Sequence, residues 1–137
     1  MCQHGCPAES TEGSTPVTAS VDLDRPDLPR DSGLPLPYGR RIELTDRGTT
    51  FVRQVRGPAG APTLLLLHGW VASAGLNWFQ TFEPLREHFN VVAPDLRGHA
   101  RGLRTRKVFR LADCADDCAA TLETLGTGPV IAVGYSM

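Results

Sequence analysis

Three short runs of apolar residues mark the chain, at residues 63–67, 90–94 and 129–133. None of them alternates apolar with polar residues, and each is shorter than a typical buried helix. Such runs are typical of strands that are buried on both sides in a parallel sheet. We therefore predict three parallel strands at these positions.

Apolar side chains recur at helical spacing between these runs. One stripe lies in residues 78–89, where Pro84 is expected to split the helix into two short pieces. A longer stripe covers residues 111–125, with acidic residues near its start that suit the positive end of a helix dipole, and Gly126 closes it. The stripes consist of Trp78, Phe82, Leu85 and Phe89, and of Leu111, Ala115, Cys118, Leu122 and Leu125.

A hairpin is predicted before the parallel strands. Ile42 and Leu44 alternate with polar neighbours, residues 46–48 supply a turn, and residues 51–55 are rich in β-formers. The predicted order is hairpin, strand, helix, strand, helix, strand. Because this alternation requires right-handed crossovers with helices on the faces of the sheet, the expected fold class is α/β.

Residues 1–39 have a different composition from the rest. They are rich in Pro, Ser, Thr, Asp and Gly, show no apolar periodicity, and contain prolines that exclude a long helix. We predict a disordered N-terminal tail over residues 1–39 and one folded domain over residues 40–137. A chain of 137 residues has the length of a single folding unit.

The charge balance bears on possible partners. With 14 Lys and Arg against 15 Asp and Glu, the net charge is −1, which gives no overall field for nucleic acid or an anionic membrane. No apolar stretch is long enough to span a bilayer, and the first residues do not resemble a secretory signal. We therefore expect a cytoplasmic protein without nucleic acid or membrane partners; its oligomeric state is not predicted.

Four cysteines form two pairs with three residues between them, Cys2 with Cys6 and Cys114 with Cys118. Structural zinc sites usually contain cysteines separated by two residues, whereas Cys114 and Cys118 lie in a predicted helix. We expect ordinary reduced thiols and no metal site.

The candidate chemistry lies at the end of the third run. Gly134, Tyr135, Ser136 and Met137 follow a buried strand directly. They match four positions of the sequence G-x-S-x-G, a sharp turn that lifts a serine hydroxyl above a sheet. The turn requires small neighbours because its backbone is strained, and Gly134 supplies one of them.

From about Arg41 onward the chain resembles the α/β-hydrolase family. Three segments match in order: residues 64–70 resemble the third strand and its H-G-x loop, residues 93–99 resemble the P-D-x-R-G-H segment, and residues 133–137 resemble the nucleophile elbow. The resemblance implies Ser136 as the nucleophile, with the backbone N–H groups of Trp70 and Met137 forming the oxyanion hole. It also implies a small-molecule acyl substrate and no metal or organic cofactor.

The chain departs from the family pattern at two places. Family members commonly have a glycine where this chain has Ala100, so the backbone of that loop is expected to differ. The family places its catalytic acid and histidine after the serine, beyond Met137. His4, His68, His88 and His99 are not expected to act as the base. We therefore expect the N-terminal part of a serine hydrolase, truncated at the elbow and prone to aggregate by itself.

The sequence also leaves other functions and roles open. A non-catalytic member of the family that binds a ligand or partner is the main alternative, whereas the absence of G-x-G-x-x-G disfavours a dinucleotide-binding domain. Trp78 and Phe82 fit a substrate pocket or the core equally well. A cluster of cations is expected to form a solvated loop rather than an anion site; it consists of Arg97, Arg101, Arg104, Arg106, Lys107 and Arg110.

Overall fold

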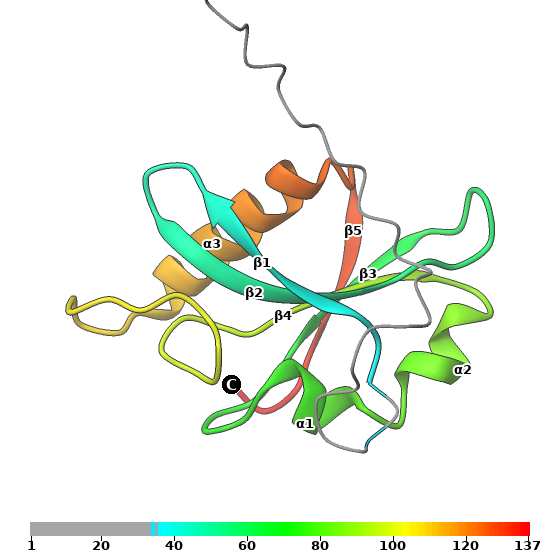
Figure 1. Ribbon diagram of the computed structural model, residues 1–137, viewed down its shortest axis with the longest axis horizontal. Coiled ribbons are helices and arrows are strands. Elements are labelled where there is room, and N and C mark those ends of the chain that lie inside the picture. Colours follow the sequence, from blue (N-terminus) through cyan, green and yellow to red (C-terminus); the bar gives the residue numbers. More distant parts are fainter. Residues whose placement is uncertain (1–33, 35) are drawn as a thin grey trace, which may run out of the picture.

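A computed structural model describes Leu34 and residues 36–137, and these residues form one sheet with helices on both faces (Figure 1). Most of the predicted tail, including Cys2, Cys6 and His4, lies outside the described residues. The elements in chain order are β1 (Gly39–Leu44), β2 (Gly48–Val55), β3 (Thr63–Leu67), α1 (Ala74–Trp78), α2 (Phe82–Arg86), β4 (Asn90–Pro94), α3 (Leu111–Leu125) and β5 (Val130–Gly134).

The five strands have the order β1-β2-β4-β3-β5. β1 pairs with β2 and β2 with β4 in antiparallel fashion, whereas β3 pairs in parallel with both β4 and β5. The structure thus confirms the α/β class, the hairpin and the three parallel strands. β3 comes first of the three parallel strands in the sequence but lies between the other two in the sheet, with β4 on one side and β5 on the other.

The hairpin turn follows from its residues. Leu44 pairs with Gly48 at the end of the ladder, and the chain reverses over the three residues between them. Asp46 and Gly48 both have positive φ, 59° and 103°, and these residue types tolerate that conformation well.

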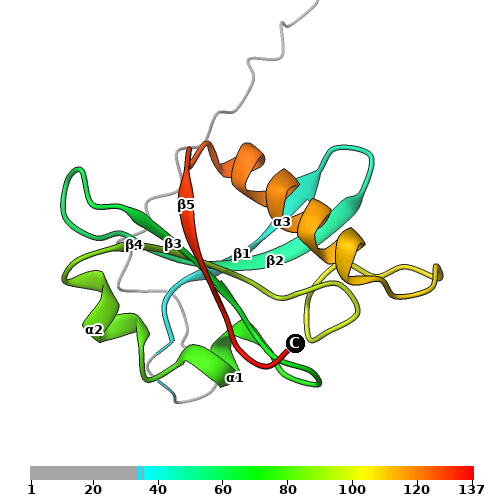
Figure 2. The ribbon, with the colours of Figure 1, turned by 180° about the vertical axis from the view of Figure 1, so that it is seen from behind.

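Alternation within the apolar strands divides the core into two layers. Leu65 and Val92 belong to the cluster beneath α3, while Leu64, Leu66 and Val91 belong to the cluster beneath α1 and α2. Figure 2 shows α3 on one face and the two short helices on the other. An unbroken apolar run is therefore required in these strands because both faces are covered.

The chain between β3 and β4 is helical, but the predicted break is misplaced. The interruption lies between Trp78 and Phe82, and Pro84 lies in the first turn of α2. Proline is tolerated there because the first-turn N–H groups have no acceptor within the helix. Phe82 is completely buried and Trp78 packs against the same cluster, so both aromatic residues belong to the core.

α3 ends as its sequence predicts. Gly126 adopts a left-handed conformation with φ of 64°, and its N–H caps the helix by donating to the carbonyls of Leu122 and Glu123. Cys114 and Cys118 are buried free thiols on this helix, and burial raises the pKa of Cys118 to about 12. Cys118 is therefore an unreactive core residue.

Arg97 does not belong to a solvated basic loop, which corrects the prediction for this residue. Only 8% of Arg97 is exposed, and its guanidinium donates to both carboxylate oxygens of Asp117 at 2.7 and 2.8 Å. Asp117, which lies on α3, also accepts from Arg47 at 3.1 Å. Asp113 lies 3.7 Å from Arg97. These acidic residues thus bind arginines, in addition to lying near the positive end of the helix dipole.

β5 lies at the edge of the described sheet and pairs there with β3 alone. Ile131 and Val133 are 53% and 36% exposed, although both are large apolar residues in a strand. Within residues 34 and 36–137, no helix combines the length and the apolar character needed to cross a bilayer.

We expect Asp117→Ala to lower the free energy of unfolding by about 3 kcal/mol, because it leaves the buried Arg97 without its bidentate partner. The matched control is Asp116→Ala, one residue earlier, whose side chain is 62% exposed and 3.8 Å from Arg47. The control is expected to change stability by less than about 1 kcal/mol. Urea unfolding of both variants measures the difference, and equal effects would contradict a structural role for the buried pair.

Candidate active site

Ser136 lies directly after the ladder that joins β5 to β3. The Tyr135 N–H donates to the carbonyl of Leu67 at 3.0 Å, which extends the parallel pairing by one step beyond Gly134. Ser136 then turns away with φ of 68°, in the left-handed region. A serine in this region is strained, and such strain persists only where the surrounding structure imposes it. The local geometry is that of a sharp turn at the carboxyl end of a strand.

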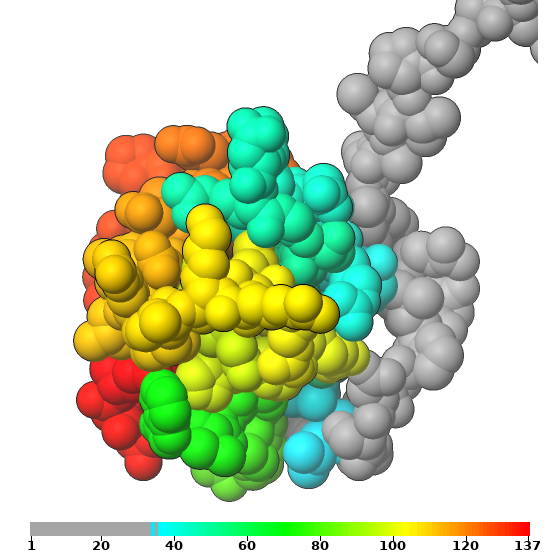
Figure 3. All heavy atoms as spheres, turned by 90° about the vertical axis from the view of Figure 1, so that its left-hand side faces the viewer, coloured from blue at the N-terminus to red at the C-terminus, as the bar shows by residue number. Residues whose placement is uncertain are grey.

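The loop after β3 lies against this turn. A Cβ atom placed on Gly69 would lie 3.0 Å from the Tyr135 ring, and 3.1 Å from both the Tyr135 carbonyl oxygen and the Ser136 Cβ. Only glycine allows the two segments to approach this closely without displacement. In Figure 3 the loop (green) borders the C-terminal residues (red) on one face of the molecule.

His68 connects the loop after β3 to the loop after β4. It is completely buried, and its Nδ1 lies 2.8 Å from the Gly69 carbonyl while its Nε2 lies 2.8 Å from the Leu96 N–H. A carbonyl only accepts and an N–H only donates, so Nδ1 carries the hydrogen and the ring is neutral. Burial lowers the pKa of His68, in agreement with the neutral form. The prediction that His68 does not act as the base agrees with this bonding.

Asp95 is a second buried connection between the same loops, and no local sequence pattern predicts this role for it. Only 2% of Asp95 is exposed, and its carboxylate accepts from the Ala74 N–H at 2.9 Å and the Arg101 N–H at 3.2 Å. Asn77 completes the set, because its side-chain oxygen accepts from the Gly69 N–H at 2.8 Å. These bonds fix the path of the loop from both ends.

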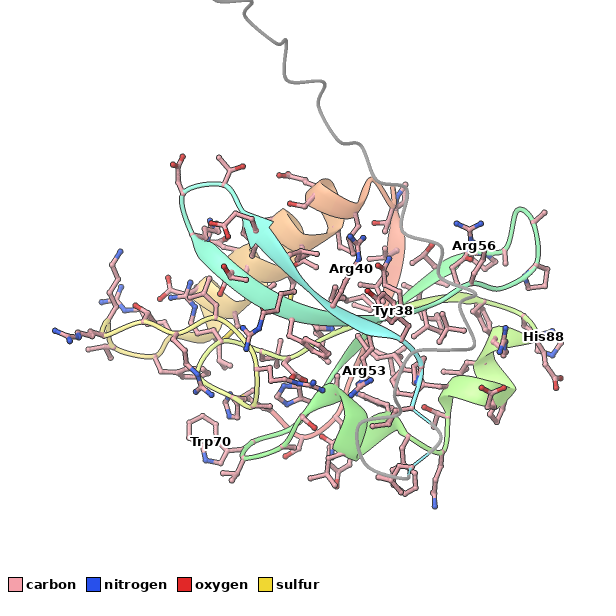
Figure 4. The ribbon with its side chains drawn as sticks, viewed as in Figure 1. Tyr38, Arg40, Arg53, Arg56, Trp70 and His88 are labelled. Carbon is pink, nitrogen blue, oxygen red and sulfur yellow. The ribbon has the colours of Figure 1, made fainter. Side chains whose placement is uncertain are left out.

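Trp70 and Met137 were the predicted backbone donors. Trp70 is 61% exposed, and Figure 4 shows its side chain projecting outward from the loop after β3. The next residue, Val71, has φ of 55°, a strained value for a β-branched residue. The Met137 N–H donates to the Tyr135 carbonyl at 2.9 Å and closes a tight turn around Ser136. Trp70 directly follows Gly69, which lies close to Tyr135 and Ser136, and Met137 directly follows Ser136. Both residues therefore lie in segments that adjoin Ser136.

The remaining described histidines have different positions. His88 lies far from Trp70, near the end of α2, as Figure 4 shows. His99 is 8% exposed, its Nδ1–H donates to the Arg97 carbonyl at 3.0 Å, and its ring packs edge-on against Trp70 at 5.0 Å. Phe109 packs against the same Trp70 ring at 5.3 Å. The described histidines thus contribute to loop structure or to the surface away from the elbow.

Ala100 occupies a left-handed backbone position with φ of 39°. This conformation favours glycine, so an alanine here is strained. The loop is closed by backbone bonds from Gly98 to the Leu103 carbonyl at 2.9 Å and from Gly102 to the His99 carbonyl at 2.8 Å. The alanine is accommodated at the cost of local strain.

In the part of the chain that the structure describes, no group of three or more His, Cys, Asp or Glu side chains is arranged to hold a metal ion.

Comparison with known proteins identifies the family. The family model described as the alpha/beta hydrolase fold matches residues 62–137. The chain is 40% identical over 81 residues to a bifunctional esterase/perhydrolase of Acinetobacter calcoaceticus, covering 58% of this chain and 29% of that protein. It is 32% identical over 87 residues to the 2-(acetamidomethylene)succinate hydrolase of Mesorhizobium japonicum, covering 61% and 30% respectively.

Solved structures agree with this assignment. A crystal structure of an E-2-(acetamidomethylene)succinate hydrolase superposes with a TM-score of 0.64 at 30% identity, covering 72% of this chain and 35% of that chain. The chain belongs to the alpha/beta hydrolase fold family. It spans about 30% of the length of the two curated relatives described above.

The neutral, buried His68 predicts a pH dependence of stability. Because burial lowers its pKa below the ordinary value of about 6.5, the unfolded chain takes up the proton first as the pH falls. The contribution of His68 to stability is therefore complete above about pH 6.5 and is lost progressively as the pH falls from there through the folded-state pKa.

Urea midpoints between pH 7.5 and pH 5 measure this loss. In His68→Gln the amide retains an acceptor but does not titrate, so the pH dependence is expected to flatten. The exposed His88→Gln is the matched control and is expected to retain the dependence. An unchanged slope in His68→Gln would show that other groups cause it.

Ala100→Gly is expected to raise the free energy of unfolding by about 0.5–1 kcal/mol, because relief of left-handed strain exceeds the added entropy of the unfolded chain. Ala119→Gly, an exposed position in the middle of α3, is the matched control and is expected to lower it by about 1 kcal/mol. Chemical unfolding measures both changes in the free energy of unfolding. Changes of opposite sign would support left-handed strain at Ala100. Destabilisation by both variants would contradict it.

Proposed function

We propose that this chain contributes the nucleophile and the oxyanion-hole loop of a serine hydrolase that cleaves an ester, thioester or related acyl bond in a small molecule. The observation that carries the proposal is the backbone of Ser136, with φ of 68° immediately after β5 and in contact with Gly69. A strained serine at the carboxyl end of a parallel strand, against the H-G-x loop, corresponds to the nucleophile elbow.

The proposed reaction begins with attack of the Ser136 Oγ on the substrate carbonyl carbon. A histidine takes the hydroxyl proton, and the carbonyl oxygen becomes an oxyanion as the C–O bond to Ser136 forms. The histidine then donates the proton to the leaving group, which departs as the acyl-enzyme forms. Water repeats the sequence and releases the acid. The histidine and its acidic partner are expected to come from residues beyond Met137.

The oxyanion is expected to bind the backbone N–H groups of Trp70 and Met137. Fixed donors stabilise developing charge without reorganisation, and loss of one donor typically costs about 100- to 1000-fold in rate. The bonds of His68 and Asn77 to Gly69 support the Trp70 segment. The Met137 N–H, which donates to the Tyr135 carbonyl, has to exchange this partner for the oxyanion.

The relatives favour a small-molecule substrate. One is a bifunctional esterase/perhydrolase and the other hydrolyses 2-(acetamidomethylene)succinate. Serine rather than a carboxylate at position 136 argues against epoxide hydrolysis through an ester intermediate, although the fold is shared with epoxide hydrolases. We further propose that the chemistry needs neither a metal ion nor an organic cofactor and takes place in the cytoplasm.

A non-catalytic binding protein is the second candidate. The observation that favours it is the bonding of the described histidines, because His68 is held between two loops and His99 packs in an aromatic cluster. Neither arrangement presents a base to Ser136. A protein with this site and no further histidine would bind an acyl compound without turnover.

The test is covalent labelling of the natural gene product with a fluorophosphonate, which reacts with activated serines. We expect stoichiometric labelling of the wild type and at least a 100-fold slower reaction in Ser136→Ala. Ser73→Ala is the matched control, since Ser73 caps α1 through a bond to Leu76 rather than lying in the elbow. Equal labelling of Ser136→Ala and wild type, or no labelling of either, would refute the nucleophile assignment.

A further inference from the structure

The segment from Arg104 to Leu111, here called the basic loop, concentrates unneutralised positive charge. Arg106, Lys107 and Arg110 are exposed and form no ion pair with any residue that the structure describes. Arg104 is exposed as well, and it donates to the carbonyls of Gly98 and Ala100 rather than to a carboxylate. The sequence from residue 96 to residue 112 contains no acidic residue.

The nearest acidic residues along the chain are engaged elsewhere. Asp117 and Asp113 on α3 face Arg97, and Asp116 lies 3.8 Å from Arg47. These carboxylates are thus directed at arginines of other segments. The near-zero net charge of the chain therefore does not describe residues 104–111, which carry cations and no acidic residue.

Apolar side chains are interleaved with these cations. Val108 is 78% exposed and Leu111 is 60% exposed, so both extend into solvent between charged neighbours. Phe109 has the opposite orientation and packs edge-on against Trp70 at 5.3 Å and His99 at 6.0 Å. The inward Phe109 anchors the loop, and its neighbours Val108 and Arg110 consequently point outward.

The basic loop and the loop after β3 form one continuous surface. Trp70 is 61% exposed and Val71 is 78% exposed, and the Trp70 ring is in contact with Phe109 of the basic loop. Figure 3 shows the two loops (yellow to orange, and green) beside the C-terminal residues (red) on one face. The surface therefore combines unpaired cations with projecting aliphatic side chains.

We propose that this surface docks on an anionic phospholipid membrane, with the cations contacting headgroups and Val108 and Leu111 entering the interfacial region. Basic residues are attracted to the negative surface potential of such membranes, and aliphatic side chains favour the boundary between headgroups and acyl chains. This inference revises the prediction of no membrane partner, which rested on the net charge of the whole chain.

Other occupants fit less well. A second copy of the same surface would bring like charges together, which costs free energy at an interface. The phosphates of a nucleic acid would bind the cations, but they make no favourable contact with the projecting Val108 and Leu111. Anionic lipid uses both features of the surface. The proposal does not depend on hydrolase activity, because docking requires no functional Ser136.

The first experiment measures co-sedimentation of the natural gene product with vesicles of phosphatidylglycerol and phosphatidylcholine, and with phosphatidylcholine alone, at about 0.1 M salt. We expect binding only to the anionic vesicles, weakening as salt increases. Arg106→Gln/Lys107→Gln is expected to weaken binding about 25-fold, at about fivefold for each cation.

The matched control is Arg41→Gln/Arg56→Gln, which removes the same charge from exposed positions on β1 and after β2. Figure 4 shows Arg56 on the side of the molecule opposite Trp70. The control is expected to bind within about twofold of wild type. Equal weakening of the two double variants, or equal binding to neutral vesicles, would overturn the proposal.

The second experiment separates insertion from charge attraction alone. Val108→Ser is expected to weaken vesicle binding about fivefold, whereas Leu76→Ser, which removes an aliphatic side chain 58% exposed on α1, is expected to leave it unchanged. No effect of Val108→Ser, together with equally tight binding to an RNA homopolymer, would assign the surface to polyanions and refute the lipid proposal.

Discussion

The parallel pairing of β3 with β5 is the constraint on which the candidate site depends. The ladder runs in register from Thr63 opposite Val130 to Leu67 opposite Gly134, and the Tyr135 N–H extends it by one bond to the Leu67 carbonyl. Parallel strands end at the same edge of a sheet, so the two loops that follow must meet there. Gly69 and Ser136 lie next to one another for this reason, although 66 residues separate them in the sequence. The left-handed backbone of Ser136 is held in place by a ladder that ends only one residue earlier.

Buried polar groups convert this proximity into a defined geometry. His68 bonds to both loops, and the Asp95 carboxylate joins the loop after β4 to the start of α1. The Arg97–Asp117 pair then connects that loop to α3 on the opposite face of the sheet. Each of these groups would cost free energy if left unsatisfied in the interior, so their bonds restrict the loops to one arrangement. The same loops carry the proposed oxyanion-hole residue Trp70 and the cations of the basic loop, so the proposed active site and the proposed docking surface adjoin one another.

The sequence predicts the strands and the position of Ser136 because both follow from local patterns. Buried parallel strands show as unbroken apolar runs, and the turn after residue 133 contains its own glycine and serine. The burial of Arg97 was not predictable in this way, since it stands among other cations and its partner Asp117 lies 20 residues later. The break before Phe82 was missed because proline is permitted in a first helical turn as well as excluded from a helix interior. Periodicity can be read from the sequence alone. Contacts between distant segments can be predicted only when the register of the sheet is known.

The central claim is that Ser136 is the nucleophile of a catalytic triad whose acid and histidine come from beyond Met137. One sequencing read of the source gene past codon 137 tests it most directly. The account predicts a glycine codon immediately after Met137, completing G-x-S-x-G, followed further on by an Asp or Glu and then a His. A stop codon at that point, or a continuation that encodes no histidine, would contradict the claim and leave a binding protein without turnover.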